Sequence, residues 1–125
     1  FMEPEYDGGC ILRAAFVLQE GEQAEIQQEM DRIIGQRQAK QPLEYPSAGS
    51  AFKRPQGDYA SRLIEVCGLK GLSVGGAEVS RKHSGFIINK GGATCADILA
   101  LADKVQQVVR EQTGFQLELE PIVLK

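Results

Sequence analysis

Ser50 lies in a short stretch whose residue types could bind and act on a small anion. The stretch runs from Pro46 to Pro55 and combines small residues and the Ser50 hydroxyl with two cations, Lys53 and Arg54. Proline cannot donate to a strand ladder or continue a helix, so we expect a shaped loop here. Small residues let a ligand approach the backbone closely, and Lys and Arg side chains bind phosphate oxygens. The stretch therefore predicts an anion-binding loop.

The role of Ser50 remains open on residue types alone. A loop serine most often satisfies nearby backbone groups with its hydroxyl. The nucleophile motif G-x-S-x-G is absent, so a hydrolase serine is not indicated. A serine can also donate a proton to a strongly basic, carbanion-like carbon in a dry site.

Other charged residues could meet an anionic ligand. There is no Walker loop and no G-x-G-x-x-G, so a nucleotide-cofactor fold is not indicated. The only histidine, His83, is either a packed imidazole or a hydrogen-bonding group, and one histidine with scattered carboxylates predicts no metal site. The best phosphate-binding candidates are four basic residues: Lys40, Lys53, Arg54 and Lys82.

Two glutamates, Glu118 and Glu120, alternate with leucines near the end of the chain. This pattern is typical of the solvated face of an edge strand. Either carboxylate would have a function only if its face of the sheet lined a cleft.

Composition and charge limit the class of protein. The chain has 125 residues, which suits one domain, and it is 42% hydrophobic. Its net charge is −3, which argues against nucleic-acid binding, yet residues 37–92 hold nine Lys or Arg against four Asp or Glu. A basic middle on an acidic body favours a small anionic ligand over a polyanion. Charged side chains that are scattered over the surface and only face solvent would give the same excess of basic residues.

Targeting and redox signals are weak. No apolar run approaches the ~20 residues that a membrane span needs, and the first residues lack the features of a signal peptide. We therefore expect a cytoplasmic protein. The cysteines are three in number, far apart and without a C-x-x-C pair, so we expect free, mostly buried thiols rather than disulfides or zinc ligands: Cys10, Cys67 and Cys95.

The first half of the chain predicts one strand and two helices. Residues 10–18 form an almost continuous apolar run of strand length. Residues 22–40 predict a helix, because Ile26, Met30, Ile33 and Ile34 fall on one face. We expect residues 42–57 to form the loop, and a short helix capped by Asp58 to end at Gly68.

The second half of the chain predicts short strands that precede and follow one long helix in the sequence. Strands are expected at residues 77–80 and 85–89, each next to glycine-rich turns. Thr94 and Asp97 form a capping-box pair for a helix that ends at Gly114. In residues 115–124, apolar and charged side chains alternate as in a final strand. The pattern predicts an α+β domain, with a small mixed sheet covered by the two longer helices.

Several segments together resemble one enzyme family. They look like the C-terminal substrate-binding domain of the UDP-N-acetylenolpyruvoylglucosamine reductases (MurB), in the shorter, type II form. The similarity covers residues 10–124, and the order and spacing of its motifs agree. The segments that carry it are 40–55 (KQPLEYPSAGSAFKRP), 68–71 (GLKG), 75–89 (GGAEVSRKHSGFIIN) and 114–124.

The resemblance implies a bacterial flavoenzyme of peptidoglycan synthesis. In that family NADPH reduces FAD, and the reduced flavin gives a hydride to the enolpyruvyl group of the UDP-sugar. Ser50 matches the family's proton donor to the neighbouring carbon. The resemblance maps the family's catalytic glutamate best to Glu120, with Glu118 as the fallback, because Pro121 and Ile122 stand where the family usually has Val followed by Arg. Lys40, Arg54 and His83 match positions that contact the substrate.

The resemblance also implies what is missing from this sequence. The family's FAD-binding domain precedes this region and none of it is present. We therefore expect residues 1–125 to be a single substrate-binding domain whose partners are the UDP-sugar and the FAD-binding domain of the same protein, with no nucleic acid or membrane partner. We expect the chain alone to fold and to be inactive. The alternative is a non-catalytic module that binds a sugar nucleotide or another phosphorylated ligand.

Overall fold

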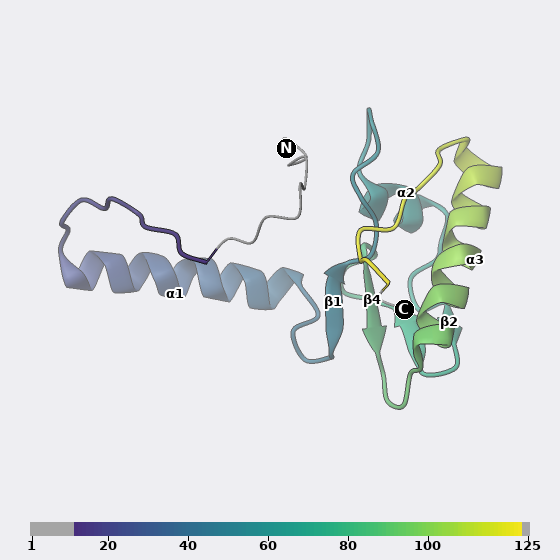
Figure 1. The fold of residues 1–125 in the computed structure, drawn as a ribbon, viewed down its shortest axis with the longest axis horizontal. Helices are drawn as coiled ribbons and strands as arrows, with labels where there is room; N and C mark the ends of the chain where they lie inside the picture. Colours follow the sequence, from purple (N-terminus) through teal and green to yellow (C-terminus); the bar gives the residue numbers. More distant parts are fainter. Residues whose placement is uncertain (1–11, 124–125) are drawn as a thin grey trace.

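The computed structural model describes residues 12–123, which form a folded body and one projecting helix. Helix α1 (Gln23–Lys40) extends away from the rest of the molecule, whereas the sheet and the other two helices form the body (Figure 1). The prediction of an α+β fold is confirmed. None of the helices in the described part of the chain is both long and apolar enough to cross a membrane.

The body contains a sheet of four short strands. They are β1 (Ser47–Ser50), β2 (Ser73–Val74), β3 (Ala77–Val79) and β4 (Phe86–Asn89). Their order is β1-β4-β3-β2, and every pair is antiparallel. The described strands thus form an antiparallel sheet rather than the mixed sheet predicted above. Two residues join β2 to β3 and six join β3 to β4, and such connections are too short for the crossover that parallel neighbours need.

The predicted loop contains an edge strand. Ser47 and Ser50 of β1 lie opposite Ile88 and Phe86 of β4, with an irregular register between the two pairs. The left-handed backbone of Gly49, with φ of 85°, accommodates this irregularity. The expectation of a loop over residues 42–57 was therefore wrong at β1. The pairing partner lies some forty residues away, so no local pattern signals it.

The two helices of the body follow their local signals. Helix α3 (Cys95–Thr113) begins with the predicted capping box between Thr94 and Asp97 and ends at Gly114, whose φ is 78°. Helix α2 (Ala60–Val66) begins one residue later than expected. The Asp58 carboxylate accepts a hydrogen bond from the Tyr59 backbone N–H at 2.7 Å, and Tyr59 itself is the N-cap residue.

The core lies between the sheet and these two helices. Leu63 and Ile64 of α2 and Leu101 and Val105 of α3 are 2% exposed or less. They pack with buried side chains of the sheet and with Leu117, which follows α3. The apolar stripe predicted for α3 is the face that covers the sheet, and it holds α2 and α3 in one body.

Helix α1 has the predicted extent but not the predicted position. It contains no buried residue, and its apolar side chains, Ile26, Met30, Ile33 and Ile34, are 44–50% exposed. The expectation that the two longer helices both cover the sheet was therefore wrong for α1. An amphipathic pattern predicts that the apolar face of a helix packs against another apolar surface, but it does not identify that surface.

Two predicted strands do not form as expected. Residues 12–18, the described part of the predicted strand 10–18, are exposed and have no strand assignment. A strand needs a pairing partner, and none of the residues 12–123 pairs with this segment. Residues 115–123 contain only an isolated bridge between Phe52 and Leu119. Pro121 has no N–H to extend that pairing.

We expect Gly76→Ala to destabilise the body. A Cβ at this position would lie 2.4 Å from the Gly91 carbonyl oxygen and 2.5 Å from the Ala93 backbone nitrogen. Backbone atoms would have to move, at a cost of about 1–3 kcal/mol in the free energy of unfolding. Chemical denaturation of the two proteins measures the change. Gly35→Ala is the control, because its Cβ would meet no atom within 4 Å; equal stability of Gly76→Ala and Gly35→Ala would contradict this account.

Candidate functional site

A cavity of about 220 Å³ brings together three of the residues predicted to be functional. It lies where the end of β1, the segment before α2 and the turn between β3 and β4 meet. Ser50, Arg54 and His83 come from these separate segments. Its full lining is Ser50, Phe52, Arg54, Tyr59, Ala60, Ser61, His83 and Gly85.

The pairing of β1 with β4 determines where Ser50 lies. The backbone N–H of Ala51 donates to the Gly85 carbonyl at 2.8 Å, and Ser50 lies opposite Phe86. The Ser50 hydroxyl makes no hydrogen bond to any residue in the described part of the chain. It is therefore not satisfying nearby backbone, which was the commoner role for a loop serine. Its proton is available to a ligand in the cavity.

His83 is held in a defined orientation. Its Nδ1 atom accepts a hydrogen bond from the Gly85 backbone N–H at 3.2 Å, and its ring meets the edge of Phe86 with centroids 4.9 Å apart. Because Nδ1 is an acceptor, Nε2 is the nitrogen that can donate to a ligand. A Cβ at Gly85 would lie 3.1 Å from Cε1 of His83, so glycine leaves the ring the room it needs.

The turn that carries His83 is itself anchored. The Ser80 side-chain oxygen accepts hydrogen bonds from the backbone N–H groups of Lys82 and His83, each at 3.2 Å. Buried Ser84 donates its hydroxyl proton to the Ser61 carbonyl at 2.6 Å. These bonds tie the turn to the start of α2 and fix one wall of the cavity.

Arg54 and Tyr59 form the opposite wall. The guanidinium carbon of Arg54 lies 4.0 Å from the centroid of the Tyr59 ring. The sequence prediction included Arg54 but missed Tyr59, because the ring lies at a helix N-cap where no motif marks it. An aromatic residue five positions after a basic one, across a turn at Gly57, was the available signal.

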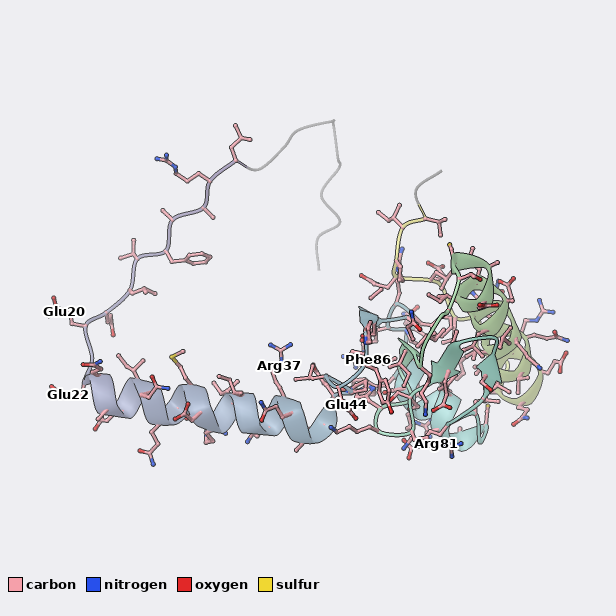
Figure 2. The ribbon with its side chains drawn as sticks, turned by 90° about the horizontal axis from the view of Figure 1, so that it is seen from below. Glu20, Glu22, Arg37, Glu44, Arg81 and Phe86 are labelled. Atoms are coloured by element: carbon pink, nitrogen blue, oxygen red, sulfur yellow. The ribbon has the colours of Figure 1, made fainter. Side chains whose placement is uncertain are left out.

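The predicted lysines lie outside this lining. Lys53 Nζ is 3.7 Å from a Glu118 carboxylate oxygen, and Lys82 Nζ is 3.3 Å from that of Glu44. A hydrogen bond from the backbone N–H of Glu44 itself and, less strongly, the contact with Lys82 lower the pKa of the Glu44 carboxyl. Figure 2 shows Glu44 where the chain passes from α1 into the body. Lys40 is the exposed last residue of α1.

The two candidate glutamates differ in their surroundings. Glu118 is the ion-pair partner of Lys53, and its side chain is 72% exposed. Glu120 makes a backbone hydrogen bond to the Ala51 carbonyl at 3.1 Å, which brings its backbone next to the residue after Ser50. Neither glutamate lines the 220 Å³ cavity. Both backbones are tied to the Ser50 segment, because the Lys53 N–H also donates to the Glu118 carbonyl at 2.8 Å, and Glu120 pairs with the residue directly after Ser50.

A larger, mostly apolar cavity of about 660 Å³ lies along β1, β4, the start of α3 and the end of the chain. Its lining includes Ser47, Asn89 and Cys95 but no Lys or Arg. The lining therefore has no basic side chain for the pyrophosphate of a dinucleotide cofactor, and the 220 Å³ cavity is too small for FAD.

The described residues also include possible metal ligands and thiols. This part of the chain has no group of three His, Cys, Asp or Glu side chains that could hold a metal ion. Cys67 is half-buried and Cys95 is exposed, so the expectation of buried thiols was wrong for Cys95. Cys95 begins α3 at the surface. Cys10 lies outside the described residues.

The arrangement can bind and protonate a small anionic molecule. Arg54 offers a planar set of N–H donors, His83 offers Nε2 and Ser50 offers a hydroxyl proton, all facing one cavity. The neighbouring wall of Phe52 and Ala60 is apolar and buried. The site thus combines anion recognition with one available proton.

Comparisons with known proteins agree on one family. The family model described as "UDP-N-acetylenolpyruvoylglucosamine reductase, C-terminal domain" matches residues 41–124. The reductase of Clostridium perfringens is 51% identical over 113 residues, which are 90% of this chain and 37% of the relative. That of Geobacillus thermodenitrificans is 52% identical over 114 residues, 91% of this chain and 38% of the relative.

A solved structure extends the similarity to the fold. The crystal structure of UDP-N-acetylenolpyruvylglucosamine reductase (MurB) from Thermus caldophilus matches with a TM-score of 0.65 and 40% identity. The match covers 82% of this chain and 35% of that one. The chain thus spans little more than a third of the length of these relatives.

Proposed function

Because the chain belongs to the family of UDP-N-acetylenolpyruvoylglucosamine reductases, whose C-terminal domain it carries, we propose that it forms the substrate-binding part of such an enzyme. The substrate would be UDP-N-acetylglucosamine enolpyruvate and the product UDP-N-acetylmuramate, a precursor of bacterial peptidoglycan in the cytoplasm. The observation that carries the proposal is the cavity in which the Ser50 hydroxyl, Arg54 and His83 meet.

The proposed reaction needs a hydride and a proton. A flavin held by the N-terminal part of the protein and reduced by NADPH would supply the hydride. Hydride addition at C3 of the enolpyruvyl group leaves an electron pair at C2, stabilised as an enol-like carboxylate. Ser50 then donates its hydroxyl proton to C2, forming the new C–H bond, and recovers a proton from solvent. Such a carbon is basic enough to take a proton from a hydroxyl.

The other residues would bind and polarise the substrate. Arg54 and His83 would contact its anionic and polar groups from within the cavity, and Lys40, Lys53 and Lys82 would add positive charge around the phosphates. Glu120 would stabilise the enol-like carboxylate as it forms, a role that depends on a group already in position. Glu118 is the second candidate for that role, and its pairing with Lys53 favours Glu120 instead.

The FAD-binding part of the same protein is the proposed partner of α1. The apolar face of α1, made of Ile26, Met30, Ile33 and Ile34, is 44–50% exposed. The family model begins at residue 41, after α1, whereas the match to the relatives is longer and takes in residues before it. An exposed apolar stripe on a helix that relatives share indicates contact with another part of the protein.

We expect the isolated chain to bind no flavin and to have no reductase activity. The larger cavity has no basic side chain in its lining, the smaller one holds only about 220 Å³, and the hydride source would lie on the N-terminal part. An absorbance spectrum of the purified chain, taken after incubation with FAD and desalting, measures retained flavin. The control is a full-length family member treated in the same way, which should retain the yellow cofactor. Stoichiometric flavin on the isolated chain would contradict the expectation.

A further inference from the structure

Tyr59, whose ring contacts Arg54, has no part in the reaction proposed above. Tyr59 is 55% exposed, although its ring lies 4.0 Å from the guanidinium carbon of Arg54. Both side chains line the 220 Å³ cavity together with Ser50 and His83. The pair therefore belongs to the wall of the candidate site and not to a remote surface.

The contact with Tyr59 leaves the N–H groups of Arg54 open to a ligand. Arg54 makes no hydrogen bond or ion pair with residues in the described part of the chain, so its N–H groups are unpaired there. An aromatic ring that covers the face of a guanidinium does not compete for the N–H groups, which lie in the plane. Those groups remain free for an oxyanion. The ring also removes side-chain conformations that would take the cation out of the cavity.

The Tyr59 ring is in turn held by its backbone. The Asp58 carboxylate accepts a bond from the Tyr59 N–H at 2.7 Å and another from Arg62 Nε at 2.7 Å. Arg62 and then this backbone bond lower the pKa of Asp58 to about 2, so the anchor stays charged at neutral pH. Gly57, with φ of 89°, makes the turn that brings the Tyr59 end of the segment back to Arg54.

We propose that Tyr59 is a positioning residue that holds the guanidinium of Arg54 in place for an oxyanion of the substrate. This inference rests on the proposed function. The oxyanion is either the diphosphate or the enolpyruvyl carboxylate, because both present oxygens that a guanidinium fork can bind.

Steady-state kinetics of a full-length reductase that carries this domain test the inference. Tyr59→Leu removes the ring, and we expect the KM for UDP-N-acetylglucosamine enolpyruvate to rise roughly three- to tenfold, as for loss of one cation–π contact, with kcat nearly unchanged. Tyr59→Phe is the matched control, because it keeps the ring and should keep the KM. Tyr59 is half-exposed and outside the core, so both variants should fold.

The same change in an Arg54→Ala background separates positioning from a merely structural role. If Tyr59 acts through Arg54, Tyr59→Leu should raise KM no further once Arg54 is absent. An unchanged KM for Tyr59→Leu, or an equal rise in both backgrounds, would overturn the inference. Absence of reductase activity in the unmodified protein would instead overturn the proposed function.

Binding of two ligands identifies the oxyanion. UDP-N-acetylglucosamine has the diphosphate but no carboxylate, whereas the enolpyruvyl compound has both. If Tyr59→Leu weakens binding of both ligands equally by calorimetry, the diphosphate meets Arg54. If Tyr59→Leu weakens binding of only the enolpyruvyl compound, the carboxylate is the group that meets Arg54. Unchanged affinity for both would overturn the inference.

Discussion

Replacement of Ser50 by alanine in a full-length reductase that carries this domain is expected to lower kcat by roughly a hundred- to ten-thousandfold, the contribution typical of a positioned proton donor. Substrate affinity should change little, because the hydroxyl makes no contact that holds the cavity together. After hydride addition, the electron pair at C2 would have no nearby proton. Steady-state assays of UDP-N-acetylmuramate formation over a range of substrate concentrations measure kcat and KM.

Ser47→Ala is the matched control for Ser50→Ala. Both serines lie in β1 and both are exposed, but only Ser50 lines the 220 Å³ cavity. Ser47 lies along the larger apolar cavity. We expect Ser47→Ala to keep nearly full turnover. Undiminished turnover in Ser50→Ala, or an equal loss in both variants, would remove Ser50 from the mechanism.

Replacement of Glu120 by glutamine is expected to lower kcat by roughly a hundred- to thousandfold in the same full-length protein. Glutamine keeps the size of the side chain but lacks the carboxyl O–H that a protonated glutamate would donate to the enol-like carboxylate. The loss should fall on kcat more than on KM, because the interaction would strengthen only as the enol-like carboxylate forms. Steady-state assays over a range of substrate concentrations separate the two constants.

Glu118→Gln tests the choice between the two glutamates. Its carboxylate is 72% exposed and lies 3.7 Å from Lys53 Nζ. Loss of such an exposed pair costs little, so we expect nearly full activity. A large loss in Glu118→Gln together with a small one in Glu120→Gln would assign the role to Glu118 instead.

Elements with strong local signals could be predicted from the sequence. The capping box of Thr94 and Asp97 and the left-handed Gly114 give α3 its two ends, and its apolar stripe is the face that packs on the sheet. Strands β3 and β4 were likewise predicted from short β-branched or aromatic runs between glycine-rich turns. In each case the structure depends on residues close together in the chain.

Elements that depend on distant partners could not be predicted in the same way. β1 exists because β4 pairs with it, and small residues alone indicate a loop. The apolar residues 12–18 indicate a strand, but among the described residues they have no partner. Helix α1 has an apolar face, yet its pattern cannot say that the face points away from this sheet. Register and packing partners are properties of the whole fold.

The candidate site was predictable only where local residue types and motifs identify its members. Ser50, Arg54 and His83 were identified from their types and motifs, and the structure brings them to one cavity. Tyr59 was missed because its contact with Arg54 depends on the turn at Gly57. Roles for Lys40, Lys53, Lys82, Glu118 and Glu120 remain predictions that mutagenesis can test.

The most direct test is the reduction of UDP-N-acetylglucosamine enolpyruvate by a full-length protein that carries this domain. Purified enzyme is incubated with NADPH and the substrate, and the product is identified by mass spectrometry. The account predicts NADPH-dependent formation of UDP-N-acetylmuramate, with the new hydrogen at C2 taken from solvent, so that deuterium appears there in heavy water. A flavin-loaded protein that oxidises NADPH but forms no UDP-N-acetylmuramate would contradict it.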